Sequence, residues 1–154
     1  MKGKYTAEEP LGRLARWLRL LGVDVEYQAV RPSKKDGETS ERRTLISRKK
    51  NILPDEGILI NSDGVENQLM EFLSIKGVVL LEESLFSRCS GCNFLLEEIS
   101  KELAGEFAVP EYVLFSSTRF TFCSQCRKVY WQGTHRERFM ETLRAMGVLR
   151  QERG

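Results

Sequence analysis

The feature that most constrains the fold of this chain is a pair of Cys-x-x-Cys motifs. Cys89 and Cys92 form the first motif, Cys123 and Cys126 form the second, and the 30 residues 93–122 separate them. Two such turns can present four thiolates as a tetrahedron, which is the arrangement of structural Zn²⁺ sites. We therefore expect a closed zinc site that holds a small β module together and leaves no position for a catalytic water. The alternative is four free or redox-active cysteines, which the second motif disfavours.

Two residues near the cysteines need an interpretation of their own. We expect Gly91, inside the first motif, to supply the backbone freedom of that turn. His135 is the one histidine of the chain. Because four thiolates already complete a zinc site, His135 is not assigned as a ligand. It is either a surface or helix-capping residue, or a contact to RNA.

The chain divides into three regions by its sequence pattern. We expect an α/β domain over residues 1–83, a zinc-ribbon module over residues 84–132, and a C-terminal helix and tail over residues 133–154. No internal repeat and no low-complexity segment interrupts this order. A length of 154 residues is enough for one medium domain or two small ones.

The first region alternates between candidate strands and helices. Apolar residues recur at the helical period from Leu11 to Gly22 and again from Gly64 to Ile75. Candidate strands are Lys4–Ala7, Val23–Tyr27, Thr44–Ser47, Gly57–Asn61 and Gly77–Leu81. A succession of strand, helix and strand predicts a parallel sheet flanked by helices.

Shorter signals mark the other two regions. Tyr112–Phe115 and Lys128–Trp131 are candidate strands of the zinc module, because both are rich in aromatic and β-branched residues. In the C-terminal region three apolar residues recur at helical spacing and are expected to face the core: Phe139, Met140 and Leu143.

Charge is balanced overall and uneven locally. The net charge of +2 is too small to indicate a nucleic-acid-binding protein. Residues 31–50, however, hold eight basic and three acidic residues, a local charge of +5. The first predicted helix also carries Arg13, Arg16 and Arg19 at steps of three. These features indicate either solvated surfaces or phosphate contacts, for which the planar guanidinium is well suited.

The chain shows no signal for a membrane or for secretion. Its apolar runs are shorter than the roughly 18 residues of a membrane span, and its N-terminus MKGKYTAEEP has no apolar stretch. We therefore expect a cytoplasmic protein without a membrane partner. A reducing cytoplasm also favours a metal over disulfides at the four cysteines.

Several stretches, in order, resemble one known family. The opening LGRLARWLRLLGVDVEY is followed by NSDGVENQL, FSRCSGCN, VPEYV and CSQCRKVYWQGTH. Together they resemble the Mut-7 C-terminal (Mut7-C) RNase domain family, whose members are PIN-like proteins with an appended zinc ribbon. The resemblance covers about residues 4–140. It implies a Rossmann-like parallel sheet in which carboxylates at the strand ends bind Mg²⁺ or Mn²⁺ for phosphodiester hydrolysis.

The resemblance also identifies departures from the family pattern. Glu8 stands where the family has an aspartate at the end of the first strand, and Asp63 fits a later acidic position. Ser47-Arg48-Lys49 stands where the family has Thr-Arg-Asp, so Lys49 occupies the place of a lost carboxylate. Further carboxylates are available from a variable segment: Asp36, Glu38 and Glu41.

Three functions follow as alternatives. The chain is a divalent-metal-dependent ribonuclease, or a module that binds RNA or a ribonucleoprotein such as the ribosome without cutting it, or a protein-interaction domain held by zinc. We expect an RNA-directed protein whose catalytic site, with Glu8 and Asp63 as remnants, is degenerate. The residues expected to contact RNA are Arg13, Arg16, Arg48 and Lys50.

Overall fold

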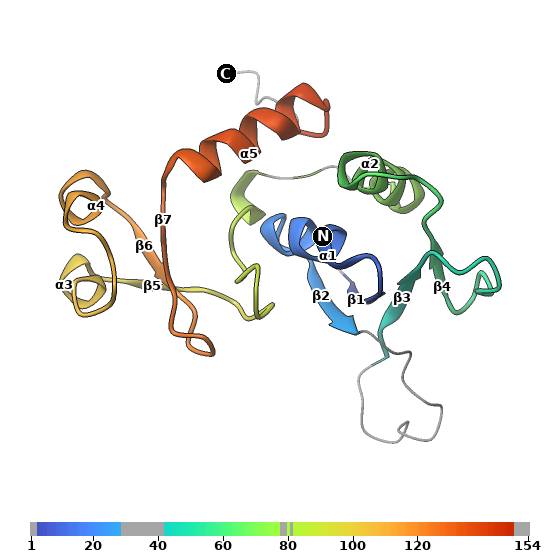
Figure 1. Cartoon of the computed structure of the whole chain (residues 1–154), viewed down its shortest axis with the longest axis horizontal. Helices are drawn as coiled ribbons and strands as arrows, with labels where there is room; N and C mark the ends of the chain where they lie inside the picture. Colours follow the sequence, from blue (N-terminus) through green and yellow to red (C-terminus); the bar gives the residue numbers. More distant parts are fainter. Residues whose placement is uncertain (1–2, 29–41, 78–79, 81, 150–154) are drawn as a thin grey trace.

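The computed structural model describes residues 3–28, 42–77, 80 and 82–149 (Figure 1). It contains a four-stranded parallel sheet of order β2-β1-β3-β4 and a three-stranded antiparallel sheet of order β5-β6-β7. Figure 1 shows the two sheets side by side, with the C-terminal helix above them. The predicted fold class is confirmed: a parallel α/β sheet flanked by helices, a small β module with four clustered cysteines, and a C-terminal helix.

The parallel sheet contains the strands that the sequence pattern predicts. Its elements are β1 Lys4–Glu8, α1 Gly12–Leu20, β2 Asp24–Gln28, β3 Thr44–Ser47, β4 Gly57–Leu59 and α2 Val65–Lys76. Their ends differ from the predicted ends by at most two residues. Of the fifth candidate strand, residues 78, 79 and 81 lie outside the described residues, while Leu80 pairs in parallel with Leu149.

The core of this sheet lies between the strands and two helices. Helices α1 and α2 lie over the same face of the sheet (Figure 1). From β1, Tyr5 points toward α2, where its ring meets the edge of Phe72 with centroids 5.2 Å apart. From α1, Leu14 and Leu18 are fully buried. Helix α1 therefore turns its arginines away from the core because its apolar residues face the sheet at the helical period.

The second region, from Glu82 to Trp131, forms a small β module with a core of its own, which we call the ribbon. Its elements are η2 Glu82–Ser84, β5 Glu97–Ile99, α3 Lys101–Ala104, α4 Glu111–Ser116, β6 Phe120–Phe122 and β7 Val129–Trp131. Lys128–Trp131 is confirmed as a strand. The buried members of the core are Ala104, Val113, Phe120 and Val129.

The prediction of a strand at Tyr112–Phe115 is wrong, because these residues lie in helix α4. Pro110 starts the turn, and its carbonyl accepts N–H bonds from Val113 and Leu114 at 3.0 and 3.2 Å. Val113 is buried, while Tyr112 and Phe115 are exposed. The local β propensity is therefore overridden by the way this turn packs on the ribbon core.

The C-terminal helix α5, Thr134–Ala145, returns to the core of the parallel sheet. Leu143 is fully buried there, and Phe139 meets the Trp17 ring edge-on with centroids 5.1 Å apart. Trp17 is thus a packing residue, as its place in an amphipathic helix indicates. Among the residues that the structure describes, no helix has the length and apolar character needed to cross a bilayer.

Candidate metal centre and strand-end carboxylates

The four cysteines meet at one point between the two turns of the ribbon. Their Sγ atoms all lie within 4.8 Å of one another, and none forms a disulfide. The Sγ atoms of Cys89 and Cys126 are 3.8 Å apart. A tetrahedron with metal–sulfur bonds of about 2.3 Å has edges of about 3.8 Å, so the geometry fits four-sulfur metal coordination. Within the described residues, this is the one group of three or more metal-ligating side chains close enough to share an ion.

The two cysteine turns have the same backbone geometry. In each, the N–H of the first cysteine donates to the carbonyl five residues later, at 2.8 Å for Cys89 and 3.0 Å for Cys123. The N–H four residues on donates back to that cysteine, from Asn93 at 2.9 Å and from Arg127 at 2.7 Å. Both donors have positive φ, 68° and 62°. The prediction for Gly91 is wrong, since the left-handed residue of the first turn is Asn93, a residue type that tolerates this region.

The cluster holds one thiol that ionises readily and two that resist ionisation. Burial raises the pKa of Cys89. Hydrogen bonds from Tyr130 and from backbone N–H groups outweigh this effect and bring the pKa down to about 7. Burial, followed by the neighbouring cysteines, raises the pKa of Cys92 to about 12. Burial likewise raises the pKa of Cys123. Ionisation of all four cysteines would therefore place mutually repelling thiolates at this point, and a bound divalent cation would offset that repulsion.

Tyr130 and His135 lie in different positions relative to the cluster. The Tyr130 hydroxyl lies 3.1 Å from Cys89 Sγ and can donate to the thiolate. Sequence reasoning placed Tyr130 in a strand and missed this contact, because only the pairing of β6 and β7 brings it over the first turn. His135 is exposed in the first turn of α5 and is not part of the cysteine cluster.

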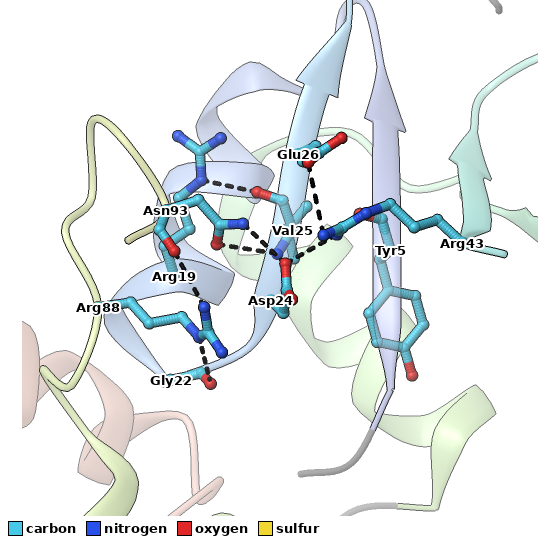
Figure 2. Close-up of polar contacts among 9 residues, drawn as sticks. All are labelled: Tyr5, Arg19, Gly22, Asp24, Val25, Glu26, Arg43, Arg88 and Asn93. Carbon is cyan, nitrogen blue, oxygen red and sulfur yellow. Dashed lines mark hydrogen bonds and ion pairs between the residues drawn. The ribbon is translucent and has the colours of Figure 1, made fainter. Parts of the chain in front are cut away.

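The first cysteine turn is docked onto the edge strand of the parallel sheet (Figure 2). Asn93 Oδ1 accepts the backbone N–H of Val25 at 3.0 Å, and Asn93 Nδ2 donates to Asp24 Oδ1 at 2.7 Å. Arg88, which precedes Cys89, donates to the Gly22 carbonyl at 3.3 Å. The turn thus accepts the Val25 N–H on the side of β2 where no strand of the described residues pairs, and it binds the Gly22 carbonyl just before β2.

Arg19 binds the same turn from helix α1. Its Nε donates to the Val25 carbonyl at 2.8 Å, and its Nη1 donates to the carbonyls of Ser90 and Gly91 at 3.0 and 3.2 Å. Burial lowers the pKa of Arg19 from its usual value. Of the three arginines at steps of three in the sequence, Arg19 therefore has a structural role.

Asp24 joins the docked turn to the sheet from the other side. Arg43 Nη1 donates to Asp24 Oδ1 at 2.7 Å and to the Tyr5 carbonyl at 3.2 Å, and its Nη2 lies 3.4 Å from Glu26 (Figure 2). Burial raises the pKa of Asp24, but the hydrogen bonds from Arg43 and Asn93 lower it below the usual value.

The first of the two predicted carboxylates, Glu8, lies at the end of β1 and is buried. Ser47 Oγ, at the end of the neighbouring strand β3, donates to Glu8 Oε2 at 2.5 Å. Ser47 Oγ in turn accepts the backbone N–H of Lys49 at 3.1 Å. The Lys49 side chain itself is exposed.

The second carboxylate, Asp63, follows β4 and forms an ion pair. Arg48 Nη2 lies 2.8 Å from Asp63 Oδ1, and Arg48 Nη1 donates to the Ser62 carbonyl at 2.7 Å. The loop is held from α2 by Glu71, which accepts the N–H groups of Asn61 and Ser62 at 2.9–3.1 Å. Burial raises the pKa of Glu71, but these backbone hydrogen bonds outweigh burial, so the pKa lies below its usual value.

Comparison with known proteins decides which family these features belong to. The sequence model described as the Mut7-C RNAse domain matches residues 3–143. The chain belongs to the Mut7-C RNase domain family. Searches of curated proteins and of solved structures gave no significant match. The family assignment covers the parallel sheet, the ribbon and most of α5, so it applies to both candidate sites.

In this Mut7-C protein the predicted site residues do not form one cluster of carboxylates. Within residues 3–28, 42–77, 80 and 82–149, no group of three or more carboxylates is close enough to hold an ion. The cation against Asp63 is Arg48, and the side chain of Lys49 is exposed. The further candidates from the variable segment, Asp36, Glu38 and Glu41, lie outside the described residues.

The predicted RNA contacts divide into exposed and engaged residues. Arg13 and Arg16 lie exposed on α1, and Lys50 is exposed after β3. Arg48 is engaged with Asp63 and Ser62. Of the basic window 31–50, the residues up to 41 lie outside the described part of the chain.

Proposed function

We propose that this Mut7-C protein is a cytoplasmic RNA-binding protein that hydrolyses RNA weakly or not at all. The observation that carries the proposal is the ion pair between Arg48 and Asp63 at the carboxyl end of the parallel sheet. Family membership favours RNA as the ligand, and the exposed Arg13 and Arg16 offer phosphate contacts. The RNA is free or part of a ribonucleoprotein such as the ribosome.

A hydrolytic centre for Mg²⁺ or Mn²⁺ requires several anionic oxygens close together. Here Glu8 accepts from Ser47, and Asp63 is neutralised by Arg48. Lys49, which stands in the position of the family aspartate, adds a positive charge and provides no oxygen ligand. The described residues therefore do not fit a divalent-metal centre.

We further propose that the metal of the four-cysteine centre is Zn²⁺ with a structural role. The support is the spacing of the sulfur atoms, which matches a tetrahedron of metal–sulfur bonds of about 2.3 Å. Four thiolates close the coordination sphere, so the centre stabilises the ribbon and does not activate water. Cys89, Cys92, Cys123 and Cys126 would hold the ion.

A divalent-metal-dependent ribonuclease is the second candidate function. Glu8, buried at the carboxyl end of β1, favours it, because a buried carboxylate at that end is where the family resemblance places a metal ligand. The side chain of Asp63 is 94% exposed and is paired with Arg48 through one oxygen, so a metal ion there would compete with the guanidinium. This candidate and the first differ in one measurable property, which is cleavage.

The test is a binding assay and a cleavage assay on the same zinc-loaded protein. Labelled single-stranded RNA is titrated with protein, and its length is followed with Mg²⁺ or Mn²⁺ present. We expect salt-sensitive binding and intact RNA. Metal-dependent cleavage that disappears in Glu8→Gln and Asp63→Asn would establish the ribonuclease instead. Absence of binding to any RNA would reject both RNA-directed functions.

A further inference from the structure

A surface cleft of about 760 Å³ lies beside helix α1. Its walls come from Glu9 and helix α1, from Tyr27 near the end of β2, and from Ser90 and Gly91 in the first cysteine turn. Glu9 directly follows Glu8, so the cleft begins next to the carboxyl end of β1. A cleft of this size, formed by three separate segments, is large enough for a ligand.

Two arginines of the cleft are available to a ligand. Arg13 and Arg16 are exposed, and within the described part of the chain neither forms an ion pair or a side-chain hydrogen bond. Arg19, one turn further on, is engaged with three backbone carbonyls. Residues three apart lie on one side of a helix, with Cβ atoms roughly 5–6 Å apart, and both arginines line the cleft. The cleft therefore presents two adjacent positive charges with planar donor groups, which suit phosphate.

Tyr27 gives the cleft an aromatic surface. Its side chain is 42% exposed, although its ring packs against the start of α1. A Cβ atom at Gly12 would lie 3.3 Å from the Tyr27 ring, so the glycine allows this close approach. Trp17 also lines the cleft, but its ring is held against Phe139. Tyr27 is thus the aromatic residue whose position suits stacking of a flat ligand.

We propose that this cleft binds a single-stranded segment of RNA, with phosphates on Arg13 and Arg16 and a base stacked on Tyr27. The inference rests on the proposed RNA-binding function and adds to it the site, the strandedness and the contact residues. Stacking requires an unpaired base, because bases inside a duplex are already stacked on their neighbours. A cationic path combined with an aromatic platform is the arrangement by which proteins bind single strands without reading their sequence.

The test measures the affinity of the zinc-loaded full chain for a labelled single-stranded RNA of about 12 nucleotides. Tyr27→Ala should weaken binding about 5- to 100-fold, which corresponds to the loss of one base–aromatic stack, while Tyr27→Phe should bind as the native chain does. Arg13→Ala/Arg16→Ala should reduce the slope of log affinity against log salt by about 1.4, since each single-strand phosphate contact contributes about 0.7. Duplex RNA should bind more weakly and should not respond to Tyr27→Ala.

The charge-matched control is Arg138→Ala/Arg144→Ala, which removes two exposed arginines from α5, away from the cleft. Its affinity and salt slope should differ little from those of the native chain. Ultraviolet crosslinking followed by peptide mapping provides an independent measurement, and the crosslink should fall on the peptide that contains Tyr27. Melting temperatures of all variants show that each one is folded.

The possible outcomes distinguish failure of the proposed binding cleft from failure of the proposed RNA-binding function. RNA binding that is unchanged in Tyr27→Ala and in the α1 double variant would overturn the cleft and leave the RNA-binding function standing. Native protein that binds no RNA would overturn both. Binding of an acidic peptide, with the same sensitivity to the α1 variants and with RNA binding insensitive to them, would show that the cleft takes a protein partner. Equal binding of DNA of the same sequence would support a single-strand cleft and overturn its selectivity for RNA.

Discussion

The side-chain amide of Asn93, the residue after Cys92, donates to Asp24 at 2.7 Å, although the two lie 69 positions apart in the chain. Asp24 begins the edge strand of the parallel sheet, and Asn93 completes the first cysteine turn. The contact therefore links the metal centre to the α/β sheet. Because Asn93 also accepts the Val25 N–H at 3.0 Å, one side chain satisfies two polar groups at the sheet edge.

Replacement of Asn93 should separate its backbone role from its side-chain role. Asn93→Gly keeps the left-handed conformation but leaves the Val25 N–H without its acceptor, and we expect a loss of about 1–3 kcal/mol in the free energy of unfolding. Asn93→Ala should cost roughly 1 kcal/mol more, because a Cβ atom is unfavourable at φ 68°. Urea denaturation of the zinc-loaded proteins measures both. Native-like stability of Asn93→Gly would show that the side-chain contacts contribute little.

Asp24 should make stability depend on pH in a defined direction. Its pKa in the folded protein is lowered despite burial, because Arg43 and Asn93 hydrogen-bond to the carboxylate. The stabilisation is fully present above the unfolded pKa of about 3.9 and is lost as pH falls through the folded pKa. The free energy of unfolding of the native chain should thus exceed that of Asp24→Asn by about 1–3 kcal/mol at pH 7. This difference should narrow below about pH 4.

The control for this prediction is Glu26→Gln, which removes a longer and more exposed ion pair with the same arginine. Glu26→Gln should lower the free energy of unfolding by less than about 1 kcal/mol. Urea denaturation across the pH range in which both proteins fold gives the comparison. A gap between the native chain and Asp24→Asn that does not change with pH would contradict the assignment of the effect to ionised Asp24.

Purified under reducing conditions, the protein should contain one zinc ion per chain. Cys126→Ser should reduce the metal content, because a hydroxyl is a poor replacement for a thiolate ligand. Ser124→Ala, in the same turn, should leave metal content unchanged. Elemental analysis measures both, and a disulfide between any two of the four cysteines in the native protein would rule the site out.

Removal of the metal should affect the sheet edge as well as the ribbon. Structural zinc contributes on the order of 10 kcal/mol to the folding of small zinc modules, so a chelator should unfold the ribbon. The first cysteine turn would then release the Val25 N–H and the guanidinium of Arg19. We expect faster hydrogen exchange in the peptide that contains β2 and unchanged exchange in α2. Exchange in β2 that is independent of metal would show that the docking survives without zinc.

Two substitutions should move the strand-end site toward metal binding. Lys49→Asp introduces a carboxylate where the family resemblance places an aspartate, and Arg48→Ala removes the ion pair of Asp63. We expect the double variant to bind Mn²⁺ more tightly than the native chain, because hard cations require anionic oxygen ligands. Calorimetric titration with Mn²⁺ and hydrolysis of labelled RNA are the measurements. Strong Mn²⁺-dependent cleavage by the native chain would mean that Arg48 and Lys49 do not disable the site.

Local patterns were sufficient for much of the fold. The apolar period of Leu14 and Leu18 predicted α1, and the run Thr44–Ser47 predicted β3 with its observed bounds. The pattern failed at Tyr112–Phe115, because the same residues suit a strand or a short helix and the ribbon core selects the helix. A pattern of residue types cannot distinguish the two when a segment is this short.

The sequence by itself determined the elements whose cause is local: the amphipathic helix α1, the strands of the parallel sheet, and the two cysteine turns whose spacing predicts a metal. Only the tertiary structure decided which polar groups meet. Arg48 pairs with Asp63 across 15 residues, and Asn93 reaches Asp24 across 69. Such contacts depend on how the strands and the ribbon approach one another, and the energy of an ion pair or hydrogen bond depends on distance and burial in that final arrangement. Sequence reasoning therefore predicted the strands that Arg48 and Asp63 follow but could not tell which cation would pair with which carboxylate.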